Sequence, residues 1–320
     1  MAKELNQLLE KINSGLENLA LPTSPANLYH PIKYILKIGG KRVRPMLAML
    51  SYQLYKKEVD QVILPILALE VFHNFTLVHD DIMDEAPLRR GNDTVHTKWD
   101  SNIAILSGDV MLVKAYELLS QAPTEVLPAL LKKFNACAQE VCEGQQKDMD
   151  FESQPFVTVE EYLDMIRQKT AVLLGFSLEM GAILAGAPKA HSDKLYNVGV
   201  NLGLAFQLQD DLLDLYGGAG FGKQIGGDII NRKKSILITK AIALAGKSRG
   251  ELIKLYNSTI ETQPQKVEEI TAALEKLNVK EKVEAMIVEY EAKGAFFNSN
   301  NSPNHQRLVE YIKLLKSRVK

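Results

Sequence analysis

Four carboxylates crowd into one short stretch of this sequence, LVHDDIMDEAPLRRG at residues 77–91. Asp80 and Asp84 are four residues apart, so in a helix their side chains project from the same face. The stretch follows an apolar segment and runs into Pro87, which indicates that the carboxylates lie where a helix ends. Because the C-terminal end of a helix already carries partial negative charge, this arrangement predicts that a bound cation neutralises them.

The same pattern occurs a second time, as DDLLD at residues 210–214, shortly before Gly217. Asp210 and Asp214 again share a helix face, and Asp211 widens the cluster. Carboxylates that converge on open space suit Mg²⁺, which takes oxygen ligands, keeps several waters and bridges one or two carboxylates to substrate phosphates. Zn²⁺ is disfavoured because few of the six histidines lie near either cluster. Two copies of the pattern favour a metal site over a solvated acidic helix end.

A phosphate bridged by metal ions needs cationic side chains nearby, and the sequence offers them beside glycine or proline. Arginine forks and lysine point charges are the groups that hold diphosphate oxygens. The candidates are Lys41 and Arg44 in GGKRVRP, Arg89 and Arg90 after the first aspartates, Lys169 in QKTA, Lys223 in FGKQIGGD, and Lys233.

Apolar residues recur three and four apart along most of the chain, which predicts helices. The expected segments are Leu5–Leu19, Ala48–Leu54, Val62–Met83, Ile103–Leu119, Val126–Val141, Val159–Leu184, Leu195–Leu215, Ser235–Leu244 and Val267–Tyr290. Loops are expected at LPTSPANLYHP, EAPLRRGND, YGGAGFGKQIGGD and FFNSNNSPNHQ. Period-two alternation is scarce and no long linker divides the chain, so residues 1–320 are predicted to form a single all-α domain, a bundle of roughly ten or more helices.

Composition excludes several classes of protein. The chain has 38 basic and 39 acidic side chains, so no global field attracts nucleic acid. No stretch approaches the ~18 uninterrupted apolar residues of a membrane span, and no export signal is apparent, so a cytoplasmic protein without an integral membrane segment is expected. Cys137 and Cys142 are expected to be small buried residues in a reducing compartment.

These motifs closely resemble those of the trans-isoprenyl diphosphate synthases, the polyprenyl synthetase family that includes farnesyl and geranylgeranyl diphosphate synthases. Paired DDxxD motifs, RRG after the first and FQLQDD at the second carry the resemblance, which covers most of the chain. It implies the isoprenoid synthase type I fold with a deep central cavity, and a homodimer. It also implies a prenyltransferase that condenses isopentenyl diphosphate with allylic prenyl diphosphates through Mg²⁺-assisted ionisation and head-to-tail coupling.

The resemblance assigns roles position by position. Asp80, Asp84 and Asp210 resemble the principal ligands of about three Mg²⁺ ions, with Asp81, Asp211 and Asp214 in support. The allylic diphosphate matches Arg89, Lys169, Lys223 and Lys233, and isopentenyl diphosphate matches Lys41, Arg44, His73 and Arg90. Phe206, Thr170 and Gln207 would stabilise the carbocation through a ring face or oxygen dipoles.

Some matches to the family are weaker. Gln145 and Asp148 resemble a GQxxD motif near the metal site, and Asp228 is expected to organise a loop. After Asp228 the family often shows Gly-Lys-x-Thr, where this chain has Arg-Lys-Lys-Ser at residues 232–235. Whether Arg232 or Lys234 shares the task of Lys233 is left open.

Product length should depend on the helix that carries the first motif. Phe75 lies five residues before Asp80, about 7 to 8 Å along a helix, and can form the floor beneath a growing prenyl chain. Thr76 at the next position is small. In the family this pattern resembles geranylgeranyl diphosphate synthases, and farnesyl diphosphate is the alternative because Phe72 and the opposite helices could raise the floor.

Three rival interpretations are weaker. A P-loop hydrolase is suggested by GGAGFGK at 217–223, but Gln224 stands where Ser or Thr should bind Mg²⁺. A terpene cyclase would share the first motif, yet its second metal site is usually built from Asn, Ser and Glu. A non-catalytic partner subunit should have lost metal or diphosphate residues, and here every expected position is filled.

Overall fold

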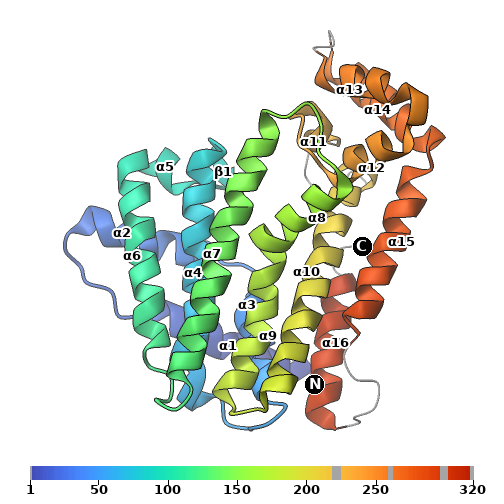
Figure 1. The fold of residues 1–320 in the computed structure, drawn as a ribbon. Coiled ribbons are helices and arrows are strands. Elements are labelled where there is room, and N and C mark those ends of the chain that lie inside the picture. The colour runs from blue at the N-terminus through green and yellow to red at the C-terminus, as the bar shows by residue number, and fades with distance from the viewer. Residues whose placement is uncertain (1, 218–224, 259–261, 296–301, 318–320) are drawn as a thin grey trace. The chain divides into compact units, whose positions relative to one another are not determined.

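The structure is a computed structural model that describes residues 2–217, 225–258, 262–295 and 302–317. Helices dominate these ranges, and the only strands within them are two residues long each, so the all-α prediction is confirmed (Figure 1). The chain divides into two compact units, described here one at a time. The first unit comprises Met1–Asn135, Phe176–Tyr196 and Asn300–Glu310, and the second comprises Ala136–Gly175, Asn197–Ser299 and Tyr311–Lys320. The single domain and the deep central cavity stay predictions.

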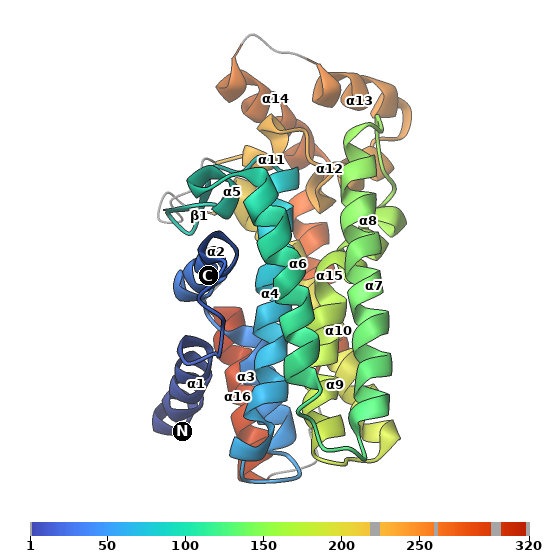
Figure 2. The same cartoon turned by 90° about the vertical axis from the view of Figure 1, so that its left-hand side faces the viewer.

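The first unit is built around one apolar helix. Its elements are α1 (Ala2–Glu17), α2 (Ala26–Lys37), α3 (Val43–Tyr52), α4 (Ile63–Met83), α5 (Val95–Lys98) and α6 (Ser101–Leu119), with parts of α7 (Leu127–Glu152), α9 (Val172–Leu184), α10 (Lys189–Tyr216) and α16 (Pro303–Ser317). A short 3-10 turn, Asp60–Val62, leads into α4. Because α4 is apolar nearly all round, it is buried among its neighbours, and it packs most extensively against α6 (Figures 1 and 2).

Aromatic rings fill the middle of the first unit. The Phe134 ring meets the Phe72 ring at 5.1 Å and the Tyr116 ring at 5.1 Å, both edge to face, and the Phe176 ring lies 5.9 Å away. Such edge-to-face pairs add roughly 0.5–1.5 kcal/mol each to the free energy of unfolding beyond the area they bury. The side of α4 that carries Phe72 is therefore firmly fixed.

The second unit holds the second aspartate motif. It contains α8 (Val159–Ile166), α11 (Gly227–Ile230), α12 (Ile236–Leu244), α13 (Arg249–Asn257), α14 (Gln263–Lys276) and α15 (Val279–Lys293), a 3-10 turn at Gly246–Ser248, and the remaining parts of α7, α9, α10 and α16. Its core includes Leu208 of α10, Ile236 of α12, Leu274 of α14 and Val283 of α15, all at most 1% exposed. These contacts hold the C-terminal half of α10 in place.

A turn of π-helix, Arg167–Ala171, joins α8 to α9, and we refer to it as the π-turn. The amide of Val172 donates to the carbonyl of Arg167, five residues back, whereas an α-helix spans four. The continuous helix expected over Val159–Leu184 is therefore interrupted, because one turn is wider than the others. Such turns are frequent at functional sites.

Several helix boundaries differ from the sequence predictions. Helix α2 begins inside the first expected loop, α16 begins inside the last, and α13 was not expected at all. The segment expected over Val267–Tyr290 is interrupted at Asn278, where φ is 50°, and so forms two helices, α14 and α15. Cys137 is buried as expected, but Cys142 is exposed, because five residues along α7 correspond to about 500° of rotation and place the two side chains on faces about 140° apart.

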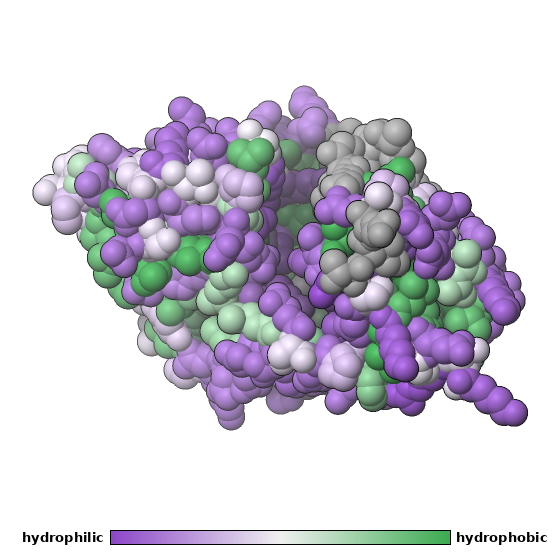
Figure 3. Space-filling view, turned by 90° about the horizontal axis from the view of Figure 1, so that it is seen from above, coloured by the Kyte–Doolittle hydropathy of each residue, from purple (hydrophilic) through white to green (hydrophobic). Residues whose placement is uncertain are grey.

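One helical segment among the described residues, Asp60–Met83, is long and apolar enough in length and composition to cross a membrane. Its most apolar window is 67% buried inside the protein, which is how the core helix of a soluble protein meets the same criterion. Seen from above, hydrophilic residues cover most of the visible surface, and the apolar areas among them are separate (Figure 3).

Candidate active site

The first aspartate motif lies at the end of α4, as expected. Asp84 is exposed at the C-cap, and its amide donates to the carbonyl of Asp80 at 2.8 Å. Asp81 faces the other way and is only 1% exposed. Its two carboxylate oxygens each accept a hydrogen bond from Nε of Arg89 at 2.9 Å, and Nη2 of Arg89 lies 2.6 Å from Oδ1. Arg89 therefore neutralises Asp81, while Asp80 and Asp84 occupy the face predicted for metal ions.

A small hairpin brings both predicted arginines to the motif. Strand β1 (Leu88–Arg89) pairs with β2 (Asn92–Asp93), so that Arg89 lies opposite Asn92. The two loop residues, Arg90 at φ 54° and Gly91 at φ 76°, both have left-handed backbone conformations, as a type I′ turn requires. The guanidinium of Arg90 donates to the carbonyl of Gly39, and this contact ties the hairpin to the GGKRVRP segment.

A buried ion pair organises that GGKRVRP segment. Nη1 of Arg42 lies 2.7 Å from Oε1 of Glu70, and the two residues are 5% and 2% exposed. Arg42 has φ 47°, which bends the chain between Lys41, which is exposed, and Arg44. Loss of either partner would leave a buried unpaired charge, so this pair fixes the turn that carries the two predicted isopentenyl diphosphate ligands.

The first unit concentrates positive charge around His73. Burial and the charges of four arginines hold the pKa of His73 well below its ordinary value. These arginines are Arg44, Arg90, Arg89 and Arg42, in decreasing order of effect. His73 is therefore a neutral hydrogen-bonding group in a cationic surrounding, which is suited to an anionic ligand such as a diphosphate.

The predicted floor residues on α4 differ in exposure. Phe72 is 1% exposed within the aromatic core, whereas Phe75 is partly exposed, with its ring 5.6 Å from the Phe72 ring and 4.8 Å from the His79 ring. Thr76 donates its hydroxyl to the carbonyl of His73 at 2.8 Å and is also partly exposed. Phe72 is thus a core residue, whereas part of the Phe75 ring is accessible and could contact a ligand.

The second unit contains a polar pocket of about 230 Å³. Five aspartates and three lysines from α7, α10, the π-turn and the segment after α10 line it. The lining residues are Asp148, Tyr162, Met165, Ile166, Lys169, Thr170, Gln207, Asp210, Asp211, Asp214, Asp228, Lys233, Lys234 and Ser235. The pocket therefore brings together most of the residues that the sequence predicted for the second motif.

The three aspartates of the second motif have different surroundings. Asp210 is exposed at the pocket. Asp214 accepts a hydrogen bond at Oδ2 from the amide of Asp228 at 3.0 Å and so orders the start of α11. Asp211 is 9% exposed, and its Oδ2 accepts from the Tyr162 hydroxyl at 2.6 Å and from the Ile236 amide at 2.8 Å.

Burial and the charge of Asp228 raise the pKa of Asp211 to about 7, although its two hydrogen bonds act in the opposite direction. Neutral donors thus hold Asp211, whereas a guanidinium holds Asp81. Of the three aspartates, Asp210 is the most exposed.

The lysines approach from two sides of the pocket. Nζ of Lys169, on the π-turn, lies 2.6 Å from Oδ2 of Asp148. The hydroxyl of Tyr256 donates to the carbonyls of Lys233 and Asp228 and thereby holds the other side. Lys234, 8% exposed, lines the pocket and lies 5.7 Å from the Tyr256 ring. Arg232 is exposed and does not line the pocket, so Lys234 accompanies Lys233 there.

Some expected residues are not among those that line the pocket. Phe206 is 38% exposed and does not line the pocket, although it lies four residues before Asp210 on α10, and Gln145 is likewise absent from the lining. Lys223 and most of the GGAGFGK segment lie outside the described residues. The sequence analysis did not predict Tyr162 or Ser235 as lining residues. Tyr162 is 49 residues from its partner Asp211, and no motif around it indicates that the two side chains meet.

The donor set of the pocket fits a hard cation, since it consists of carboxylates rather than sulfur or imidazole. Within the part of the chain that the structure describes, no group of three or more His, Cys, Asp or Glu side chains could hold a metal ion by itself. Mg²⁺ commonly takes only one or two carboxylates and completes its shell with water and phosphate oxygens. The residues are therefore compatible with a metal ion that arrives with a phosphate ligand.

Comparisons with known proteins agree with this chemistry. Residues 25–277 match the family model for polyprenyl synthetase. The chain is 42% identical to the geranylgeranyl pyrophosphate synthase of Geoglobus acetivorans over 232 residues, 72% of this chain and 73% of that protein. It is 42% identical to a short chain isoprenyl diphosphate synthase of Methanocaldococcus jannaschii over 241 residues, 73% and 72% of the two chains.

Among solved structures, the geranylgeranyl pyrophosphate synthetase of Pyrococcus horikoshii Ot3 superposes with a TM-score of 0.89 at 31% identity. The match covers 98% of this chain and 97% of that chain.

Proposed function

Because the chain belongs to the polyprenyl synthetase family of prenyltransferases, we propose that it condenses isopentenyl diphosphate with an allylic prenyl diphosphate, and that geranylgeranyl diphosphate is its main product. The observation that carries the proposal is the pocket of the second unit, where five aspartates meet three lysines. Carboxylates alone would repel a diphosphate. Carboxylates with lysines among them suit a diphosphate that brings divalent cations.

Mg²⁺ is the proposed cofactor, with about three ions per active site, and it would supply Lewis-acid stabilisation of charge on the departing diphosphate. Asp80, Asp84 and Asp210 are the proposed principal ligands. Lys169 and Lys233 would bind diphosphate oxygens directly. Their positive charge helps the allylic C–O bond to ionise, because it compensates the negative charge that develops on the leaving oxygen.

The carbocation formed in that step would be stabilised by Thr170 and Gln207, which line the pocket beside Asp210. Both present oxygen dipoles and neither is a strong nucleophile, so they can stabilise positive charge without trapping it. Phe206 remains a proposed contributor from outside this pocket. The cationic group around His73, with Lys41, Arg44 and Arg90, would hold the diphosphate of isopentenyl diphosphate.

Product length is proposed to depend on Phe75. Its partial exposure leaves a ring that can stop the growing chain, whereas Phe72 is enclosed by Phe134 and Phe75. An aromatic residue at this position followed by the small Thr76 resembles the family's geranylgeranyl diphosphate synthases, and this favours geranylgeranyl over farnesyl diphosphate. The relatives reported above are named for geranylgeranyl and short-chain products, which supports the same choice.

The direct test is incubation of purified protein with Mg²⁺, labelled isopentenyl diphosphate and each of dimethylallyl, geranyl and farnesyl diphosphate, followed by chain-length analysis of the products. We expect a geranylgeranyl product, abolished by EDTA and restored by excess Mg²⁺. Accumulation at farnesyl diphosphate would leave the condensation intact and contradict Phe75 as the floor. Folded protein that elongates none of the three starters would overturn the proposed function.

A homodimer is also proposed, and one face of α6 supports it. Four apolar side chains are exposed along two adjacent ridges of this helix, namely Ile105 at 42%, Leu106 at 57%, Val113 at 66% and Tyr116 at 38%. A row of this kind is typical of a surface that another protein covers. In sedimentation experiments Val113→Glu should shift the protein towards monomer. The matched variant Val288→Glu, at a position that is 63% exposed on α15, should leave the dimer unchanged.

We further propose that the enzyme acts in the cytoplasm. Cys137 and Cys142 are both free thiols, which is the usual state in a reducing compartment. Fractionation of the native cells, with detection of the protein in the supernatant after removal of membranes, checks this location.

A further inference from the structure

The π-turn carries two of the residues that line the pocket, Lys169 and Thr170. In a regular α-helix successive residues turn by about 100°, whereas a π-turn spreads its residues over a wider ring. The directions of Lys169 and Thr170 therefore depend on this wide turn being kept. A π-turn has poorer hydrogen-bond geometry than an α-helix, so something in the surrounding structure must favour it.

Two glycines make room for the π-turn. A side chain on Gly144 of α7 would come within 2.7 Å of the Lys169 Cα and of the Gln168 carbonyl carbon. A side chain on Gly203 of α10 would come within 2.6 Å of the Ala171 Cα. Real Cβ atoms do not approach other atoms this closely, so the backbone of the π-turn fits between α7 and α10 only because both positions lack a side chain.

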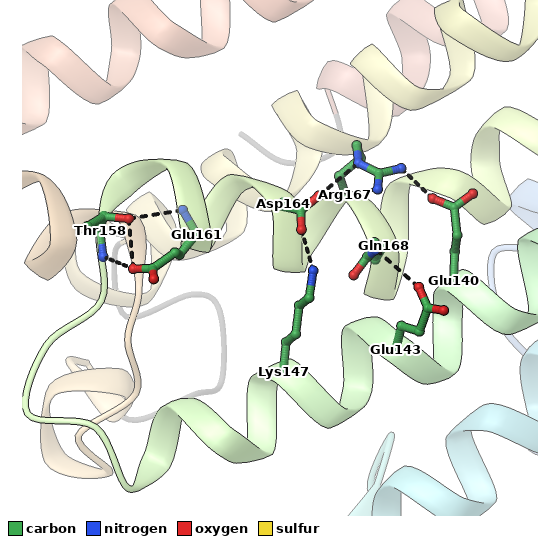
Figure 4. Close-up of polar contacts among 8 residues, drawn as sticks. All are labelled: Glu140, Glu143, Lys147, Thr158, Glu161, Asp164, Arg167 and Gln168. Carbon is green, nitrogen blue, oxygen red and sulfur yellow. Dashed lines mark hydrogen bonds and ion pairs between the residues drawn. The ribbon is translucent and has the colours of Figure 1, made fainter.

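A network of charges holds the start of the π-turn, as Figure 4 shows. Nη1 of Arg167 donates to Oε2 of Glu140 on α7, and Nη2 lies 3.2 Å from Oδ1 of Asp164 on α8. Nζ of Lys147 on α7 donates to Oδ2 of Asp164. The side-chain amide of Gln168 donates from Nε2 to Oε2 of Glu143 at 3.4 Å. Arg167 is thus the first residue of the π-turn and the one residue in Figure 4 that joins it to both neighbouring helices.

We propose that Arg167 is a positioning residue for the diphosphate site, holding the π-turn against α7 and α8 so that Lys169 and Thr170 face the pocket. The geometry supports this role because the side chain of Arg167 leaves the turn on the side of Glu140 and Asp164, two residues before Lys169. Lys147 shares the partner Asp164 but belongs to α7, so its loss should leave the turn in place. The inference rests on the proposed function, since it assumes that Lys169 binds diphosphate.

The test compares wild type with Arg167→Gln, Arg167→Lys and the matched control Lys147→Gln. Binding of inorganic diphosphate in the presence of Mg²⁺ is measured by isothermal titration calorimetry, and kcat and KM are measured with geranyl and isopentenyl diphosphate. We expect Arg167→Gln to weaken diphosphate binding and lower kcat by roughly tenfold each, with KM for isopentenyl diphosphate changed less than about threefold. Arg167→Lys should recover part of both losses, and Lys147→Gln should stay within about twofold of wild type.

A second variant covers the case in which Arg167→Gln fails to fold. Glu140→Gln removes the same ion pair from the α7 side and should reproduce the loss of diphosphate affinity. The inference is overturned if Arg167→Gln or Glu140→Gln, folded by circular dichroism, binds diphosphate as tightly as Lys147→Gln. Failure of the wild-type protein to bind diphosphate with Mg²⁺ would instead overturn the proposed function on which the inference rests.

Discussion

The two DDxxD motifs have the same letters and both lie near the C-terminal end of a helix, yet their middle aspartates are held in different ways. Asp81 is held by the guanidinium of Arg89, a full positive charge at 2.6 Å. Asp211 is held by a tyrosine hydroxyl and a backbone amide, which are neutral donors. In both motifs the second aspartate is buried, at 1% exposed for Asp81 and 9% for Asp211, while the first and last residues are the ones proposed to meet ligands.

The difference follows from the structure that comes after each motif. After Asp84 the chain forms a tight hairpin, and Arg89 reaches back eight residues to Asp81. After Asp214 the described chain resumes at Ile225 and forms two short helices, so that the partner of Asp211 is the amide at the start of α12, 25 residues away. One motif is therefore completed locally, and the other is completed by tertiary packing.

The largest expected effect tests whether Asp80 and Asp210, the first aspartates of the two motifs, have equal roles. Asp80→Ala and Asp210→Ala should each leave the fold intact and lower kcat for condensation by roughly a hundredfold or more, because each would remove a proposed ligand of the cations that stabilise the leaving group. Steady-state turnover at saturating Mg²⁺, together with circular dichroism, is the measurement. Near-normal turnover in either variant would remove that motif from the proposed site.

The next prediction concerns stability and separates the two inward aspartates. Asp81→Asn removes the negative charge nearest to Arg89, a mostly buried arginine that then keeps only Asp80 at 4.0 Å, and should lower the free energy of unfolding by about 3 kcal/mol. Asp211→Asn keeps an acceptor for its neutral donors and should cost only about 1 kcal/mol. Urea unfolding without Mg²⁺ measures both, so that metal binding does not contribute. Equal losses would show that the charge of Arg89 does not distinguish the motifs.

The hairpin behind the first motif can be strained without touching either aspartate. Gly91 and Gly186 have φ values of 76° and 73°, and a side chain at either position would meet no other atom within 4 Å. Alanine at each should therefore cost about 1 kcal/mol of stability through backbone strain alone. Turnover should fall severalfold only in Gly91→Ala, because only this hairpin positions Arg89. Equal activity in the two variants would mean that the hairpin tolerates the strain without moving Arg89.

Much of this organisation could be predicted from the sequence, for reasons that differ by region. The bounds of α4 were predicted to within one residue, because a long apolar segment that is followed by a proline is rarely anything other than a buried helix. Helix α2 was missed because Pro31 and neighbouring polar residues resemble a loop, although the structure continues the helix through them. The pocket of the second unit is lined by residues between 148 and 235. Most of them were expected because each belongs to a short motif that can be recognised from its neighbours in the sequence.

What could not be predicted depends on contacts between distant segments. The π-turn requires space that Gly144 and Gly203 provide, and neither glycine is marked by its own neighbours in the sequence. Tyr162 becomes the partner of Asp211 only once α8 is packed beside α10. Cys142 was expected to be buried because cysteine usually is, but it lies on a different face of α7 from the buried Cys137, and which face is covered depends on packing against distant segments.

The smallest expected effect concerns α8, which carries Tyr162 to the second motif and has no counterpart at the first. Thr158 and Glu161 form a capping box, in which the Glu161 carboxylate accepts from the Thr158 amide at 2.8 Å. That backbone hydrogen bond, followed by the Thr158 hydroxyl, lowers the pKa of Glu161 below 4.5, against a small opposing effect of burial. Ionised Glu161 therefore stabilises the fold above pH 4.5, and this contribution is lost as the pH falls through its lowered pKa.

Glu161→Gln should accordingly reduce the free energy of unfolding at pH 7 by about 0.5 kcal/mol, a small value because solvent screens an exposed carboxylate. The deficit relative to wild type should shrink as the pH falls below 4.5. Glu160→Gln removes a charge from the same helical turn without the capping contact, so its deficit should be smaller at pH 7. Urea unfolding of the three proteins at pH 7 and at pH 3 measures both differences, and a Glu161→Gln deficit that stayed constant with pH would assign it to packing rather than to the carboxylate. In that case the start of α8, and with it the position of Tyr162, would not depend on this charge.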